Sequence, residues 1–179
     1  MSLNNLRTQF LNTLETIFSY TGDVRYLNSL PFMSATYEYF RKRHFNNVKD
    51  FTVEEEAQLK QKLPTVYTKL GKDYGLSYYI ECLQPKDVFD YARYRSGCQF
   101  LIDDVGKFVP DGPEKDENIE ELIDSFEATK YLLEKGGSDD EYYEYPEEPA
   151  PEHLGVPETH DWWKPIELIY DNSKYQQNN

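Results

Sequence analysis

The sequence predicts an all-α protein: a three-helix antiparallel bundle extended by one or two further helices, with a long extended acidic C-terminal tail. Apolar residues recur three and four positions apart through most of residues 1–137, as expected for helices that each bury one face. The charge is divided unevenly, because residues 1–110 carry a net charge of +1 and residues 111–179 carry −15. We therefore expect a helical body at 1–137, with its three-helix core at 3–75, and a tail at 138–179.

The first two helices have recognisable boundaries. Residues 3–19 carry a single apolar stripe, and Ser2 can cap its first turn. The second helix is expected to begin near Pro31, which suits a first helical turn, and to run to about Phe45. Asn46-Asn47 then breaks it. The stripe of the first helix consists of Leu3, Leu6, Phe10, Leu14, Ile17 and Phe18.

The third helix has the clearest start signal in the chain. Thr52 and Glu55 stand three residues apart and form a capping box, in which each side chain can bond the other residue's backbone amide. Pro64 lacks an amide hydrogen and crowds the preceding turn, so we expect a kink or a restart there. The apolar stripe then continues to Gly71 or Gly75.

The rest of the body is less regular. Residues 76–83 are short and aromatic, and periodicity leaves open whether they form a strand or a helical turn. A fourth helix is expected at 85–105, where Gly97 costs about 1 kcal/mol relative to alanine and allows a break. Residues 109–113 carry the proline and glycine signals of a loop, and a fifth helix is expected at 116–135.

The tail changes composition abruptly. Residues 139–152 combine acidic residues, tyrosines and prolines and have almost nothing to bury, so we expect them to be extended unless bound. An apolar anchor follows at 162–170, and we expect it to dock on the body or on a partner, because exposed tryptophans beside an apolar run promote aggregation. The anchor residues are Trp162, Trp163, Ile166, Leu168, Ile169 and Tyr170.

No motif in the chain indicates a reaction. Residues 70–75 lack the spacing of a phosphate-binding loop, and Cys82 and Cys98 do not combine with the scattered histidines in a zinc-site spacing. His160-Asp161 resembles an acid–base pair, but adjacent side chains rarely point at one another. The acidic tail repels phosphates, which disfavours nucleic acid. We expect a protein that is not an enzyme, with no metal, no cofactor of its own and no transmembrane segment.

The run Arg41-Lys42-Arg43-His44 is the main positive feature, and it allows two interpretations. In one, it is the charged last turn of a helix, where cations favour the negative end of the helix dipole. In the other, it is a small anion-binding face that engages a carboxylate-rich helix or a phosphate group.

Residues 3–75 resemble the LYR-motif superfamily of small mitochondrial helical proteins. The segment Leu6–Leu11 stands where that family has its Leu-Tyr-Arg signature and the apolar pair that follows, although only Arg7 of the tripeptide is retained. Residues 39–44 are similar to the family's Phe-Arg-x-x-Arg/His pattern, and an acidic helix start at 50–56 and a Leu/Tyr-rich third helix follow.

The resemblance implies a non-catalytic accessory subunit or assembly factor of a mitochondrial respiratory-chain or ATP synthase complex, on the matrix side. It also implies binding of an acyl carrier protein, whose acyl-phosphopantetheine would be the one cofactor involved. Partner-binding residues would be Arg7, Arg41, Lys42, Arg43 and His44, together with Trp162, Trp163, Ile166 and Tyr170 of the tail. The inter-helix groove for the acyl chain would be lined by Phe10, Leu14, Phe32, Tyr39 and Phe40.

The charge distribution leaves a second function open. A region with a net charge of −15 and many tyrosines is also typical of an acidic inhibitor, an immunity protein or a nucleic-acid mimic that blocks a basic toxin or nuclease. Such a protein would be cytoplasmic rather than mitochondrial.

Overall fold

The computed structural model describes residues 1–82, 88–112, 115, 117, 118, 121, 123, 124, 155–157, 159 and 160. These residues form helices and connecting turns without any strand, so the prediction of an all-α fold is confirmed. The expected fifth helix is helical at its described positions between 117 and 124, whereas most of it, the acidic stretch 139–152 and the anchor 162–170 lie outside the described residues. In order, the elements are α1 (Leu3–Ser19), η1 (Val24–Tyr26), α2 (Leu30–Phe45), α3 (Val53–Leu70), α4 (Tyr74–Glu81), α5 (Val88–Asp103) and η3 (Gly106–Phe108).

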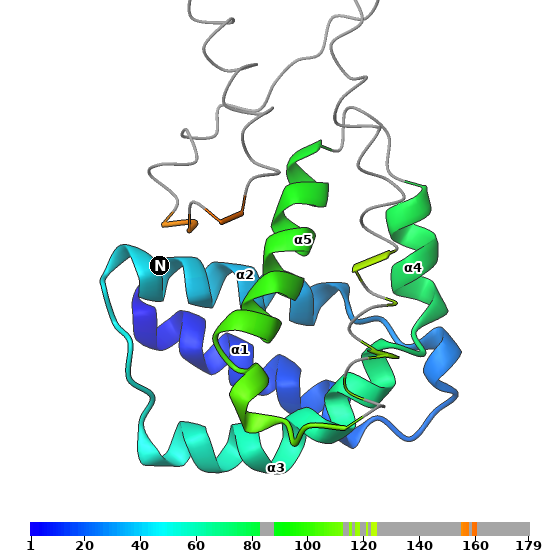
Figure 1. The fold of residues 1–179 in the computed structure, drawn as a ribbon, viewed down its shortest axis with the longest axis horizontal. Helices are drawn as coiled ribbons and strands as arrows, with labels where there is room; N and C mark the ends of the chain where they lie inside the picture. Colours follow the sequence, from blue (N-terminus) through cyan, green and yellow to red (C-terminus); the bar gives the residue numbers. More distant parts are fainter. Residues whose placement is uncertain are drawn as a thin grey trace, which may run out of the picture.

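Helices α1, α2 and α3 form the predicted three-helix core. Figure 1 shows α1 and α2 running in opposite directions side by side, with α3 below them and parallel to α1. Helix α5 stands across this layer and packs on α2. The core therefore lies where the inner faces of α1 and α2 meet α3 on one side and α5 on the other.

The helix ends follow the chemistry of their capping residues. Ser2 accepts a hydrogen bond from the Asn5 amide at 3.3 Å, as expected. The capping box of α3 is complete, because the Glu55 amide donates to Thr52 Oγ1 at 3.2 Å and the Thr52 amide donates to Glu55 Oε2 at 2.8 Å. Asn47 has a positive φ of 54°, and this left-handed residue turns the chain out of α2.

Three local expectations are resolved by the structure. Residues 74–81 form a helix, capped by Asp73, and not a strand. Helix α3 continues as one element through Pro64 instead of restarting there. Helix α5 does not break at Gly97. A Cβ at this position would lie 2.6 Å from the Met33 carbonyl oxygen. Glycine therefore allows the backbones of α5 and α2 to approach closely.

The core is dominated by aromatic rings. Phe10 of α1 stacks on Phe32 and Tyr39 of α2 with ring centroids 5.8 Å and 5.3 Å away, and it meets Phe40 edge-on at 5.4 Å. Phe40 also stacks on Phe100 of α5 at 5.8 Å. Fully burying a large apolar side chain contributes roughly 1.5–3 kcal/mol, so this cluster is a major source of stability and ties three helices together.

Candidate functional site

The four consecutive residues of the basic run do not form one face. A helix turns by about 100° per residue, so four neighbours point around its whole circumference. Arg41 is half-buried and pairs with Glu38, with Nη2 2.6 Å from Oε2. Lys42 lies over the Phe45 ring, with Nζ 4.8 Å from its centroid. Arg43 points inward and is only 3% exposed. The expectation that Arg43 is open to a partner is therefore wrong.

Arg43 fastens the loop that joins α2 to α3. Its Nη2 donates to the carbonyl oxygens of Lys49 and Asp50, both at 3.0 Å, and its Nη1 donates to Tyr39 Oη at 3.0 Å. The guanidinium also lies 4.0 Å from the centroid of the Phe51 ring, a cation–π contact. These contacts satisfy a charged group that would otherwise be costly to bury.

The same network continues to α1 through Glu55, which is 3% exposed. Tyr39 Oη donates to Glu55 Oε1 at 2.5 Å. Arg7 Nε lies 3.2 Å from the same carboxylate, and Arg7 Nη2 donates to Thr52 Oγ1 at 3.0 Å. Arg7, which we expected to face a partner, thus joins α1 to the start of α3 while its side chain remains about one-third exposed.

The electrostatics of the network favour an ionised Glu55. Burial alone would raise the pKa of its carboxyl group, but the hydrogen bonds from Tyr39 and Thr52 and the positive charge of Arg7 together lower the pKa below its usual value. Burial raises the pKa of Tyr39 to about 12, with the neighbouring carboxylate adding to the effect, so Tyr39 remains a neutral donor. These are the properties of a structural network that fixes three helices.

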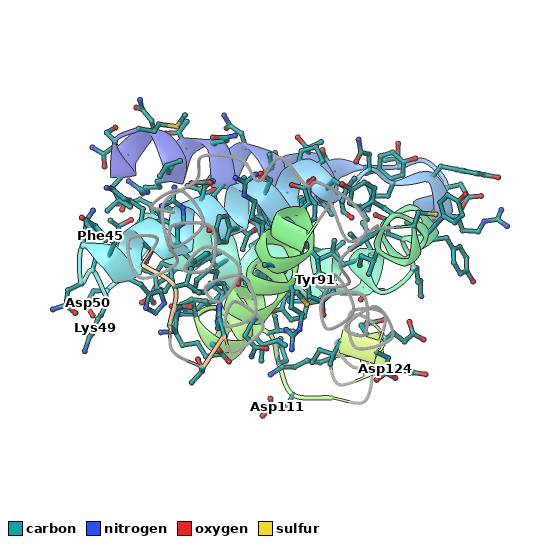
Figure 2. The ribbon with its side chains drawn as sticks, turned by 90° about the horizontal axis from the view of Figure 1, so that it is seen from above. Phe45, Lys49, Asp50, Tyr91, Asp111 and Asp124 are labelled. Carbon is teal, nitrogen blue, oxygen red and sulfur yellow. The ribbon has the colours of Figure 1, made fainter. Side chains whose placement is uncertain are left out.

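Of the basic run, Arg41 and Lys42 remain partly exposed, and the exposed Lys49 follows them in the loop after α2. Figure 2 shows Phe45 and Lys49 at one end of the molecule, away from Asp111 and Asp124. Phe45 is 57% exposed although it is a large apolar residue. We call Arg41, Lys42, Phe45 and Lys49 the α2-end surface. The sequence indicated its charges, but its exposed aromatic ring was not predicted.

The His44 side chain contacts α5 and the residue that follows it. Its Nε2 lies 3.2 Å from Asp104 Oδ2, and its ring stacks on Phe100 with centroids 5.3 Å apart. These two contacts are within the protein itself, although about two-fifths of the His44 side chain is exposed.

The expected acyl-groove residues do come together, but they form closed core. Their rings and side chains pack on one another between α1 and α2, and each is at most 2% exposed. Dense packing of this kind leaves no opening between them in this conformation. In this conformation Phe10, Leu14, Phe32, Tyr39 and Phe40 line closed core, and their role in holding an acyl chain stays a prediction.

A short piece of the C-terminal region returns to the body, and the sequence did not predict where. We call residues 155–157, 159 and 160 the strap; Figure 1 shows them beside the C-terminal end of α2, next to α5. A Cβ on Gly155 would lie 2.3 Å from the Arg41 carbonyl oxygen, so the two backbones are in direct contact. Val156 packs against the core, and His160 is buried. The residues Trp162, Trp163, Ile166 and Tyr170 lie outside the described part.

A second exposed aromatic group lies on η1 and α4. Tyr26, Tyr74 and Tyr78 are each at least 67% exposed. Tyrosines are favoured at contacts because they offer a rigid ring and a hydroxyl group. The sequence signal was the excess of tyrosine, 16 in the whole chain, which exceeds what a core of this size needs.

Within the part of the chain that the structure describes, no three His, Cys, Asp or Glu side chains gather as metal ligands. In the same residues, no helix is long and apolar enough to cross a membrane. Comparison of the chain with protein-family models, with curated proteins and with solved structures gives no match.

Proposed function

We propose that this protein is a non-catalytic accessory subunit or assembly factor that acts through protein–protein contacts. The observation that carries the proposal is the α2-end surface, where an exposed phenylalanine stands among three cations at the end of a helix. An exposed aromatic anchor surrounded by charge is typical of binding hot spots. The buried network of Arg43 and Glu55 supports the proposal, because it holds this end of α2 and the loop after it in a fixed geometry.

The chemistry of the surface suggests a partner that presents carboxylates around an apolar side chain. Lys42 and Lys49 can each pair with a carboxylate, and Phe45 can insert its ring between the charged groups. Arg41, which pairs with Glu38, adds to the positive charge beside them. Cations at the negative end of a helix dipole also complement the dipole, so the surface keeps its charge at little cost. An acidic helix has this combination of groups on one face.

The resemblance to LYR-motif proteins makes the proposal more specific. It suggests a mitochondrial respiratory-chain or ATP synthase complex on the matrix side, and an acyl carrier protein as one partner. The α2-end surface supports a charge contact with such a partner. The closed packing of Phe10 and Phe40 does not support entry of an acyl chain, which would have to separate α1 from α2.

Affinity purification of the tagged full chain from its source, followed by mass spectrometry, tests the proposal. We expect recovery within a larger complex, and loss of that complex in the double variant Phe45→Ala with Lys49→Glu. The matched control is Val53→Ala with Lys72→Glu, which changes one exposed apolar residue and one exposed cation elsewhere. Recovery of the wild-type chain alone, or equal loss in both variants, would contradict the proposal. Purified acyl carrier protein, with and without an acyl chain, then tests the specific partner.

The acidic C-terminal region favours a second candidate, because residues 111–179 carry a net charge of −15. Such a region can steer association with a basic protein, and the binding then weakens steeply with salt. Co-purification of a basic nuclease or toxin, inhibited by the added chain, would favour this inhibitor function over the subunit function.

A further inference from the structure

The strap is held by contacts of two different kinds. At one end, the backbone of Gly155 lies against the last turns of α2, next to the Arg41 carbonyl oxygen and Phe45. Gly155 has a φ of +69°, a conformation that favours glycine, so both its backbone and its missing side chain suit this close approach. At the other end, the His160 amide donates to the Pro157 carbonyl oxygen at 2.9 Å and closes a turn.

The His160 side chain forms the second contact, on α5. It is 2% exposed, and its Nδ1 lies 3.0 Å from Ser96 Oγ. Its ring packs on Phe100 with centroids 4.7 Å apart. A histidine placed in this way joins a segment far along the chain to the aromatic core between α2 and α5.

The charges that act on His160 oppose its protonation. Arg95, which is 6% exposed, lies on α5, and His44 of α2 stacks on the same Phe100 ring that His160 contacts. The Asp104 carboxylate pairs with His44. Burial, and then the charges of Arg95 and His44, lower the pKa of His160 from its usual value of 6.5 to about 3.

We infer that the strap is a proton-sensitive contact: its residues occupy a peptide-binding surface made by α2 and α5, and protonation of His160 releases them. We assign this segment of the chain itself as the occupant, because two of its residues fit the surface: Gly155 lies against the backbone of α2, and His160 contacts Ser96 on α5. A cation at position 160 would lose its solvation inside the core and would be repelled by the positive charge of Arg95. The docked strap therefore requires the neutral imidazole.

The size of the effect follows from linkage between proton binding and docking. The pKa of His160 is lowered in the docked state, so docking is strongest above pH 6.5 and weakens as the pH falls from 6.5 towards 3. Each pH unit in that range changes the docking constant by about tenfold. Between pH 7.5 and pH 5.0, the docking constant should therefore fall about 30-fold.

Release would also change the α2-end surface, because Gly155 lies against Phe45 and Arg41. This consequence rests on the proposed function, whereas the docking equilibrium does not. The strap would then regulate partner binding, and a mildly acidic environment would free the end of α2 on the side that now contacts Gly155.

Hydrogen exchange of the full-length protein tests the inference without any partner. The probe is the amide of His160, which is bonded to Pro157 in the docked strap, measured at pH 7.5 and pH 5.0 and corrected for intrinsic exchange. We expect its protection to fall about 30-fold while amides in the middle of α1 keep theirs. His160→Gln should remove the pH dependence, and the control His153→Gln, which changes another histidine of the same region, should retain it.

The inference would be overturned by protection in the wild type that changes less than threefold, by an equal fall in His160→Gln, or by no protection of this amide at any pH. An equal fall in α1 would mean global unfolding and would also overturn it. If glutamine does not dock, His160→Phe supplies a ring that cannot be protonated. A direct NMR titration of the His160 ring gives a further check, because an ordinary midpoint near 6.5 in the docked protein would contradict the inference.

Discussion

Replacing Glu55 by alanine should be among the most destabilising single changes in the three-helix core. The carboxylate accepts from Tyr39 Oη and from the Thr52 amide, and it pairs with Arg7. Its removal leaves a buried hydroxyl without this acceptor and opens the capping box of α3. Hydrogen bonds to charged groups are worth about 1.5–3 kcal/mol, and the loss of a cap costs about 1 kcal/mol. The exposed part of Arg7 adds little. We expect a loss of roughly 2–4 kcal/mol.

Urea unfolding followed by circular dichroism measures this loss as a lower midpoint at unchanged slope. The matched control is Glu54→Ala, which removes an exposed carboxylate from the same first turn and should cost at most about 1 kcal/mol through the helix dipole. A double-mutant cycle with Tyr39→Phe should give a larger coupling energy than one with Arg7→Met, because the Tyr39 contact is buried. If Glu55→Ala stayed within about 0.5 kcal/mol of the wild type, the network would not be a source of stability.

The pH dependence of the same residue has a defined sign. The pKa of Glu55 is lowered in the folded protein, so its contribution is complete above the unfolded value of about 4.3 and is lost as the pH falls through the lower folded value. Wild-type stability should therefore decline more steeply in this acidic range than that of Glu55→Gln. Parallel declines in denaturation curves collected at several pH values would show that the carboxylate is not favourably ionised in the fold.

Two further changes test other contacts. Gly97→Ala should destabilise the protein by about 1–3 kcal/mol despite alanine's higher helix propensity, because the added Cβ would meet the Met33 carbonyl oxygen. The control Gly112→Ala should be close to neutral, because its added Cβ has no neighbouring atom within 4 Å. Equal melting temperatures for both variants would contradict the close crossing of α2 and α5. Lys69→Met should lower the free energy of unfolding by about 1–3 kcal/mol, because Nζ donates to the carbonyl oxygens of Ile17, Phe18 and Tyr20 at the end of α1. Thermal unfolding measures this loss, with Lys72→Met as the exposed control. Equal shifts in melting temperature for the two variants would refute the prediction.

The helices could be predicted from local signals, whereas the role of individual charged residues could not. Spacing and capping residues located α1, α2 and α3 because their causes are local: a buried stripe, Ser2, and the pair Thr52 and Glu55. The direction in which Arg43 points depends on the position of residues 49 and 50, which periodicity does not reveal. The segment 76–83 was too short for periodicity to distinguish strand from helix.

Long-range contacts account for the remaining differences. In the sequence, Gly97 indicates a weak point of a helix. Its role in the close approach of α5 to α2 follows only from the position of Met33 in the structure. From sequence alone, the strap cannot be distinguished from the polar tail around it. Its docking depends on a single glycine and a single histidine and not on a repeated pattern. The cations of the α2-end surface were evident in the sequence. The exposure of Phe45 was not predicted, because it depends on how α2 ends.

Helix α1 is tied to α3 at both of its ends, and this has a consequence for the order of folding. Arg7 bonds Thr52 and pairs with Glu55 near the start of α3, while Lys69 bonds the last carbonyl groups of α1 from the end of α3. Sliding α1 by one turn, about 5.4 Å, would break both attachments together, so they fix one register. During synthesis, the attachment at the start of α1 requires the chain to residue 55, and the attachment at its end requires the chain to residue 69. Helix α1 therefore gains these contacts only after α3 has been made, and we expect the three-helix core to form in one cooperative step.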